Sequence, residues 1–116
     1  NYAAFHNPTF PQVFRSCTPG LQFTAPVYEY THSRGGCSVI GGSVYRGNRY
    51  TTLYGRYFFA DWCTGEVWTM ARQGNQWQVD PAADTVLQIS TFGEDNRGGL
   101  YAGVFMDGTI YKVTVR

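Results

Sequence analysis

The residues able to do chemistry are few, and they lie in polar segments between runs of aromatic and β-branched residues. His32 could act as a general base or as a polar contact to a sugar, because an imidazole titrates near neutral pH; a hydrogen-bonded structural histidine is the alternative. Asp61 and Trp62 could bind a sugar through carboxylate hydrogen bonds and indole stacking, whereas Trp62 could instead fill the wedge between two packed sheets. Glu94 and Asp95 resemble a general acid/base pair, but we interpret them as a solvated turn.

These residues do not make up a complete catalytic set. The sequence contains no serine nucleophile elbow and no phosphate-cradling glycine loop. Its two histidines, His6 and His32, are too few for a convincing metal cluster. Cys17, Cys37 and Cys63 lack C-x-x-C spacing, which favours one disulfide and an odd thiol over a zinc site. We therefore expect no metal site and no cofactor carried by this segment.

The composition places these residues in one folded domain. The chain has 116 residues, of which 43% are hydrophobic, 17% aromatic and 15% charged. So much apolar ring surface favours a packed core over disorder. The formal net charge is +1, and acidic and basic residues are spread along the chain. Nucleic acid and anionic membrane surfaces are therefore not expected partners, and no apolar stretch reaches the roughly 18 residues that span a bilayer.

The chain is expected to be all-β, with short antiparallel strands. Runs rich in Val, Tyr, Phe, Thr and Trp alternate with Gly, Asn, Asp or Pro. Gly74-Asn75 and Asp107-Gly108 supply the positive φ angles that tight hairpin turns require. The expected strands are Val27–Tyr30, Val39–Tyr45, Tyr57–Ala60, Val67–Met70, Trp77–Val79, Ile89–Phe92, Leu100–Val104 and Ile110–Val115.

Residues 1–26 differ from the rest, because prolines 8, 11, 19 and 26 would interrupt any strand ladder. We expect an irregular loop segment packed on a β body formed by residues 27–116. The chain begins at Asn1 without a basic or apolar leader, so we expect a processed chain or a fragment of a longer one. Together with the cysteine content, this favours a secreted, periplasmic or extracellular location.

An internal repeat orders the strands. Residues 56–70 align without gaps onto residues 99–113, an offset of 43. Aromatic and turn positions coincide, as in the matches of Phe58 with Tyr101, Gly65 with Gly108 and Trp68 with Tyr111. A repeat of about 40 to 45 residues holding four short strands is the size of one β-propeller blade. Chance similarity of two hairpins is the alternative.

Counting strands against this repeat gives about two four-stranded blades. Val27–Tyr30 would be a spare outer strand, the next four strands a whole blade, and the last three the inner strands of another. Closed propellers show such an offset, because their first and last blades share strands to remove free edges. Two blades cannot close a ring alone. We therefore expect the remaining blades to come from a longer chain or from a homotrimer of this one.

In a propeller, alternate loops share the face where ligands usually bind. Here those loops are Thr31–Ser38, Asp61–Gly65, Asp80–Gln88 and Met106–Gly108, and they carry the ligand-face candidates His32, Arg34, Asp61, Trp62, Gln88 and Asp107. Cys37 and Cys63 fall in adjacent loops, so we expect them to form a disulfide, with free buried thiols as the alternative. Cys17 would be left for an outside partner or as a free thiol.

Ordinary ion pairs are the expected role of two arginines of the β body. Arg46 and Arg56 should pair with Glu29, Asp61 or Glu66 at the surface or at a strand edge, and each pair would contribute about 0 to 1 kcal/mol if exposed. A role for either arginine in binding substrate is the alternative.

Four ordered segments of the chain share a further pattern: VYEYTHS at 27–33, CSVIGGSVYRG at 37–47, GRYFFADWCTG at 55–65, and STFGED at 90–95 followed by GLY at 99–101. Together they resemble the glucose/sorbosone dehydrogenase family, which includes the hedgehog-interacting-protein-like propellers. The similarity runs from about residue 25 to the end. The resemblance implies an exported six-bladed propeller, of which this chain would form the C-terminal third.

The characterised enzymes of that family oxidise sugars with pyrroloquinoline quinone and calcium, so the resemblance implies these cofactors for a full-length protein. Its catalytic histidine and calcium ligands lie in earlier blades, so the resemblance assigns neither role here. Quinone-binding members place arginines before the last inner strand, where this sequence reads Leu87-Gln88-Ile89-Ser90. The expected function is structural closure and part of a pocket wall. The alternative is a non-catalytic extracellular propeller that binds carbohydrate or protein.

Overall fold

A computed structural model gives the structure of the chain and describes residues 24–115. The chain divides into two units, Asn1–Tyr30 and Thr31–Arg116. The predictions for residues 1–23, Cys17 and His6 included, lie outside the described residues. Residues 24–30 form no strand, so the predicted strand Val27–Tyr30 is wrong. This segment has the composition of a strand, but it pairs with none of the described strands, and strand composition alone does not build a ladder.

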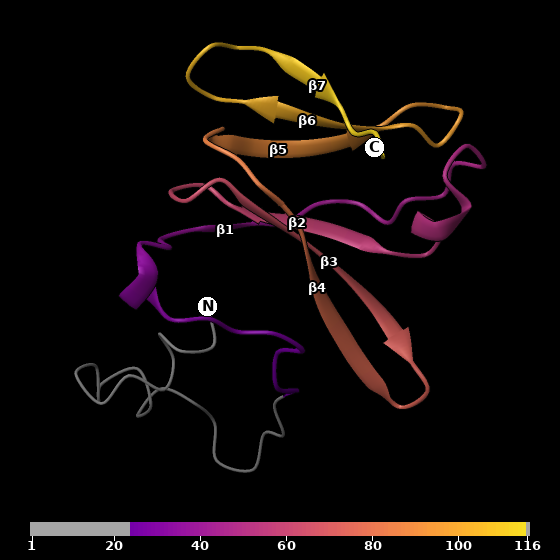
Figure 1. Cartoon of the computed structure of the whole chain (residues 1–116), viewed down its shortest axis with the longest axis horizontal. Coiled ribbons are helices and arrows are strands. Elements are labelled where there is room, and N and C mark those ends of the chain that lie inside the picture. The colour runs from indigo at the N-terminus through magenta and orange to yellow at the C-terminus, as the bar shows by residue number, and fades with distance from the viewer. Residues whose placement is uncertain (1–23, 116) are drawn as a thin grey trace. The chain divides into compact units, whose positions relative to one another are not determined.

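The second unit contains two antiparallel sheets (Figure 1), as the all-β prediction required. The first has the order β1-β2-β3-β4, formed by β1 (Val39–Ile40), β2 (Tyr57–Asp61), β3 (Glu66–Gln73) and β4 (Gln76–Asp84). The second has the order β5-β6-β7, formed by β5 (Ile89–Glu94), β6 (Leu100–Val104) and β7 (Ile110–Lys112). Both are meanders of sequential strands. Two 3-10 turns, His32–Arg34 and Thr51–Leu53, precede β1 and β2. Residues 24–115 include no helix with the length and apolarity needed to cross a membrane.

Of the seven strands in the described residues, only β6 has its predicted bounds; β2 and β5 extend by one and two residues, and β3 spans Glu66–Gln73 where Val67–Met70 was expected. The expected strand Val39–Tyr45 ends at Ile40. Beyond it, Gly42 runs so close to the Phe58 carbonyl that no side chain would fit there. Pairing resumes only as a single bridge between Val44 and Tyr57. The last strand ends at Lys112 rather than at Val115.

In the opposite direction, the expected strand Trp77–Val79 extends to Gln76–Asp84 and takes in most of the predicted loop Asp80–Gln88. It contains Pro81, which lacks an N–H. Proline is tolerated there because β4 is an edge strand, where one side of the backbone needs no ladder partner.

The internal repeat is the same hairpin built twice. In β2–β3, the pairs are Phe58 with Thr69, Phe59 with Trp68 and Ala60 with Val67. In β6–β7, the pairs are Tyr101 with Lys112, Ala102 with Tyr111 and Gly103 with Ile110. Adding 43 to both members of each first pair gives the second pair. The two hairpins therefore share their register, as a structural repeat requires.

The two sheets share one hydrophobic core. Its buried members are Tyr45, Phe58, Ala60 and Val67 from the first repeat and Ile89, Leu100, Ala102 and Val104 from the second. Side chains alternate between the faces of a strand. Leu100 and Ala102 are the repeat equivalents of Tyr57 and Phe59, on the face of β2 opposite to Phe58. The two sheets therefore stack front to back, with β5 against β1 and β2.

Front-to-back stacking leaves the far side of the second sheet uncovered within the described residues. Val67 is 8% exposed, whereas its repeat equivalent Ile110 is 72% exposed. All three residues of β7 are exposed, and no fourth strand pairs with β7 in the described part of the chain. An apolar side chain thus occupies the same position in both repeats, but only the first is covered.

Glycines fit the turns as predicted. Gly74 and Gly108 have φ angles of 61° and 67°. Gly98, in the β5–β6 turn, combines a positive φ of 74° with a close approach to another segment. A Cβ on Gly98 would come within 2.6 Å of the Gly47 nitrogen. The two backbones touch directly, so this contact fixes the β5–β6 turn against the segment that follows β1.

We expect Gly98→Ala to destabilise the fold by about 3 kcal/mol, because the left-handed backbone and the contact with Gly47 both penalise a Cβ. Gly55→Ala is the matched control. Gly55 also has a positive φ (81°), but nothing lies within 4 Å of its added Cβ, so only the backbone cost of about 1 kcal/mol applies. Urea unfolding of both variants measures the difference. Equal losses of unfolding free energy would show that the Gly47–Gly98 contact is unimportant.

Candidate functional site

Asp61, the last residue of β2, carries a side chain that is 0% exposed. Its Oδ2 accepts hydrogen bonds from the backbone N–H groups of Cys37 and Ser38, both at 2.9 Å. Its Oδ1 accepts hydrogen bonds from the N–H groups of Cys63 at 2.9 Å and Thr64 at 2.8 Å, and from the Thr64 hydroxyl at 3.2 Å. A carboxylate shielded from solvent and occupied by these donors has no oxygen to offer a sugar, so we assign Asp61 a structural role.

The same carboxylate aligns the predicted disulfide, which is confirmed. Cys37 and Cys63 are bonded, with their Cα atoms 5.7 Å apart. Together with Asp61 they form a cluster whose potential metal-ligand atoms lie within 4.8 Å of one another. The sulfur atoms are bonded to each other and the carboxylate binds backbone amides, so this cluster is built as a cross-linked corner rather than as an ion site.

An aromatic pair joins the turns that follow β2 and β6. The rings of Trp62 and Phe105 meet edge to face with their centroids 6.4 Å apart. The two residues are repeat equivalents, separated by 43 positions. Trp62 is half-buried, while Phe105 and Met106 are 66% and 72% exposed. The sequence interpretation missed Phe105, although adding 43 to Trp62 would have found it.

The other ligand-face candidates divide into two groups. Gln88 lies beside the aromatic pair, because its carbonyl accepts the Phe105 N–H at 2.9 Å. Asp107 caps its own turn by accepting the Thr109 N–H at 2.9 Å. His32 and Arg34 lie on an exposed 3-10 turn. Within residues 24–115, no side-chain hydrogen bond or ion pair links these last two residues to the aromatic pair.

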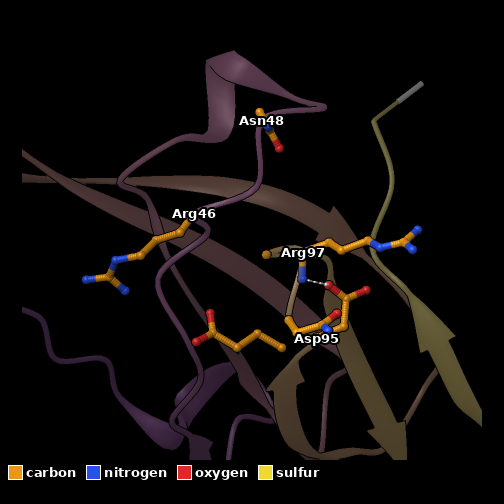
Figure 2. Close-up of a pocket in the computed structure, with 7 residues that line it drawn as sticks. Arg46, Asn48, Asp95 and Arg97 are labelled. Carbon is orange, nitrogen blue, oxygen red and sulfur yellow. Dashed lines mark hydrogen bonds between the residues drawn. The ribbon is translucent and has the colours of Figure 1, made fainter.

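A polar depression of about 710 Å³ lies beside the β5–β6 turn and is lined in part by Arg46, Asn48, Asp95 and Arg97 (Figure 2). Asp95 accepts hydrogen bonds from the N–H groups of Gly99 and Arg97, each at 2.8 Å, and from the Tyr101 hydroxyl at 2.9 Å. These bonds, led by that of Gly99, hold the pKa of Asp95 below its ordinary value.

Asp95 is therefore an ionised turn residue rather than a general acid. The guanidinium groups of Arg46 and Arg97 point away from each other (Figure 2), so they do not converge on one anion. The depression has polar walls but no arrangement of groups that would act on a common ligand.

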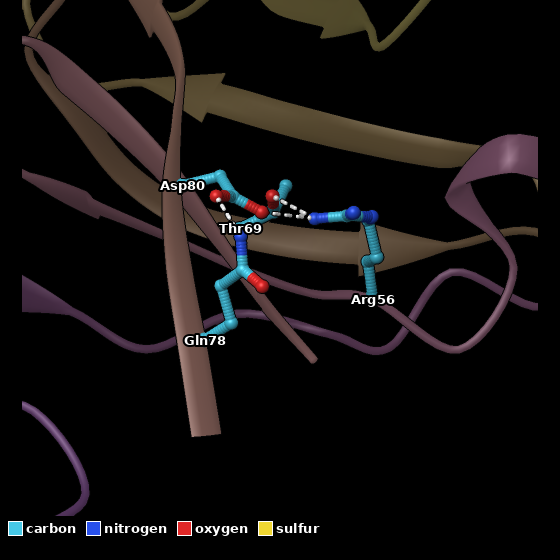
Figure 3. A network of polar contacts seen from close by, with 4 residues as sticks. All are labelled: Arg56, Thr69, Gln78 and Asp80. Carbon is cyan, nitrogen blue, oxygen red and sulfur yellow. Dashed lines mark hydrogen bonds and ion pairs between the residues drawn. The ribbon is translucent and has the colours of Figure 1, made fainter. Parts of the chain in front are cut away.

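A polar network ties β4 to the start of β2 (Figure 3). Arg56 Nη1 donates to Asp80 Oδ2 at 2.7 Å and to Thr69 Oγ1 at 3.2 Å, and Gln78 Nε2 donates to Asp80 Oδ1 at 2.8 Å. The bond from Arg56, followed by that from Gln78, lowers the pKa of Asp80 from its ordinary value.

The predicted partners of Arg56, namely Glu29, Asp61 and Glu66, are wrong. Asp80 takes their place because β4 extends far enough to place it opposite Thr69. Arg46 forms no ion pair with any residue of the described range.

The described residues bring together three groups of side chains. No protein-family model matches the chain. Its arrangement provides a cross-linked corner, an aromatic pair with Gln88 beside it, and a polar network within one sheet. None of these places a nucleophile beside a base within the described part of the chain.

We expect Asp61→Asn to destabilise the fold by about 3 kcal/mol. The donors that now share two carboxylate oxygens would find one acceptor oxygen on the asparagine amide, which also carries no charge. Asp107→Asn, at an exposed turn that accepts one N–H bond, should cost about 0.5 kcal/mol. Urea unfolding with the disulfide intact measures both. A small loss at Asp61 would contradict its structural role.

Stability should fall in acid through Asp80 and Asp95. Because their pKa values are lowered in the folded state, their stabilisation is fully present above the unfolded value of about 3.9 and is lost as the pH falls below it. Urea midpoints measured between about pH 6 and about pH 3 should therefore decline. The double variant Asp80→Asn/Asp95→Asn should show a flatter decline, and an unchanged slope would contradict this account.

Proposed function

We propose that this chain forms two adjacent blades of an exported β-propeller of the glucose/sorbosone dehydrogenase-like kind, where it closes part of the ring and forms part of a pocket wall. The observation that carries the proposal is the common register of the β2–β3 and β6–β7 hairpins. The two hairpins stack front to back through one core. A ring of blades is built by repeating such a step.

The exposure of Ile110 supports the presence of neighbouring blades. Its equivalent Val67 is covered by the second sheet, so a further sheet stacked in the same way would cover Ile110. Repeat units of this type bury a continuous core only when their neighbours are present. The chain's first contribution to function is then structural. Its two sheets stack on each other, and the second sheet offers its exposed face to the next blade.

The pocket wall would be formed by the turns that carry Trp62 and Phe105, with Gln88 alongside. These groups supply apolar contact and hydrogen bonding rather than bond-making chemistry. Residues 87–90 do not fit the carboxylates of a quinone, because they include no cation and Ile89 is only 3% exposed. Any quinone or calcium of the full-length protein would be bound by other blades.

The second candidate function is a non-catalytic extracellular propeller that binds carbohydrate and assembles from copies of this chain. The exposed Phe105 beside Trp62 favours it, because aromatic rings at a surface can stack on a sugar. The lack of a cation in residues 87–90 also agrees with a protein that does not bind quinone.

The intact mass of the native particle distinguishes the two candidates. Under denaturing, non-reducing conditions, the proposal predicts a chain well above 13.0 kDa, and a quinone-dependent sugar oxidation assay would follow. A denatured mass of 13.0 kDa within a larger native particle would favour the self-assembled binding propeller. A particle of 13.0 kDa under both conditions would contradict both candidates.

A further inference from the structure

The β2–β3 turn, the β4–β5 connection and the β6–β7 turn lie at the same end of the two sheets, on the left of Figure 1. The first two are joined because the N–H and the hydroxyl of Thr85 both bond the Gly65 carbonyl, at 3.2 and 2.7 Å. The bond from the Phe105 N–H to the Gln88 carbonyl, at 2.9 Å, joins the second connection to the third. The three connections therefore form one continuous surface, although they are far apart in sequence.

Each of these connections carries apolar side chains. Val86, in the β4–β5 connection, is 96% exposed. Phe105 and Met106 are also exposed, and the half-buried Trp62 contacts the Phe105 ring. We call this group the apolar turn surface, formed by Trp62, Val86, Phe105 and Met106. Exposed apolar side chains that are gathered together and bordered by polar residues mark a place of contact with another molecule.

Carboxylates border the apolar turn surface. Glu66 and Asp84 lie next to the bonds that join the first two connections, Asp107 lies in the β6–β7 turn, and all three side chains are exposed. None of them forms an ion pair with a residue of the described range. Residues 61–66, 84–88 and 105–109 contain no lysine or arginine. Glu66 and Asp84 are also directly opposite each other in the β3–β4 pair, where like charges destabilise the strands. A cation brought by a partner would relieve this repulsion.

A depression of about 230 Å³ lies beside this acidic pair, and Glu66, Trp68, Pro81 and Asp84 are among the residues that line it. The aliphatic part of a lysine or arginine side chain packs on apolar groups while its charged head reaches a carboxylate. An indole ring adds attraction for a cation placed over its face. The depression therefore fits a cationic side chain, and the neighbouring apolar turn surface fits an apolar one.

We infer that the apolar turn surface and this depression bind a short segment of another protein that carries a lysine or arginine beside an aliphatic or aromatic residue. In this arrangement the cation lies between Glu66 and Asp84, and the apolar side chain packs on Val86 and Phe105. A neutral sugar could stack on the aromatic pair, but it carries no charge to offset the carboxylates. The inference shares the aromatic pair with the proposed pocket wall but requires no further blade and no cofactor.

Isothermal titration calorimetry of the intact 116-residue chain, with its disulfide formed, tests the inference. The probe is a short amidated peptide of alternating lysine and leucine residues, which should bind. Its affinity should fall about tenfold when the salt concentration rises from about 0.05 M to about 0.5 M, because exposed charges are screened. A peptide of alternating glutamate and leucine should not bind, and one of alternating lysine and serine should bind at least about tenfold more weakly, because it lacks the apolar contact.

Two variants locate the binding on this surface. Asp84→Lys should weaken binding of the lysine–leucine peptide about tenfold. It places opposite charges in the β3–β4 pair, so its urea midpoint should not fall. Glu94→Lys is the matched control, since it makes the same charge change at the far end of β5. Phe105→Ser should also weaken binding about tenfold, whereas Tyr54→Ser, which removes a ring of similar exposure elsewhere, should leave binding unchanged.

A wild-type chain that does not bind the lysine–leucine peptide would overturn the inference, and so would equal losses in the variants and their controls. Binding of a glucose oligosaccharide that Phe105→Ser abolishes and Asp84→Lys leaves unchanged, without peptide binding, would overturn it in favour of a carbohydrate. Failure of the peptide together with a denatured native chain well above 13.0 kDa would reject the inference and leave the proposed function standing.

Discussion

The buried carboxylate of Asp61 is the constraint on which the first sheet depends. β1 is two residues long and offers little pairing of its own, so the bonds from the Cys37 and Ser38 amides to Asp61, together with the bond from the Trp62 N–H to the Ser38 carbonyl, extend its attachment to the end of β2. A buried charge is costly unless its hydrogen-bonding capacity is satisfied, and the donors around Asp61 satisfy it. The disulfide then cross-links a corner that the carboxylate has already aligned. The repeat equivalent of Asp61 is Val104, a core residue, so the second hairpin relies on packing at the same position.

This difference explains how one hairpin can be used twice. In both repeats the register of the hairpin is the same, and the residue at the end of the first hairpin strand is buried. In the first repeat the residue at that position, Asp61, aligns the cross-linked corner, while in the second repeat Val104 packs in the shared core. Stacking then brings Trp62 and Phe105 together. The proposed role in a pocket wall follows from this geometry, because the two turns are held side by side by the same packing that builds the core.

Much of the fold could be predicted from the sequence, because the features that indicate it depend on residues close together in the chain. Strand composition, the glycine turns and the repeat indicated the hairpins, and loop adjacency indicated the Cys37–Cys63 bond. The structural role of Asp61 could not be read from its neighbours in sequence, since its donors include amides more than twenty residues away. The partner of Arg56 depended on β4 continuing through Pro81, and whether Val27–Tyr30 forms a strand depended on its pairing with another strand. Such features are set by register and by partners, which composition does not encode.

Native-state amide hydrogen exchange tests the central claim most directly. The account predicts that the amides of Cys37, Ser38, Cys63 and Thr64, although they lie in loops and turns, exchange as slowly as the core amides of β2, because the buried Asp61 carboxylate accepts all four. In Asp61→Asn the protection of these four amides should fall while that of β6 persists. If these four amides of the wild-type chain exchanged as fast as the amides of exposed turns, the account would be contradicted.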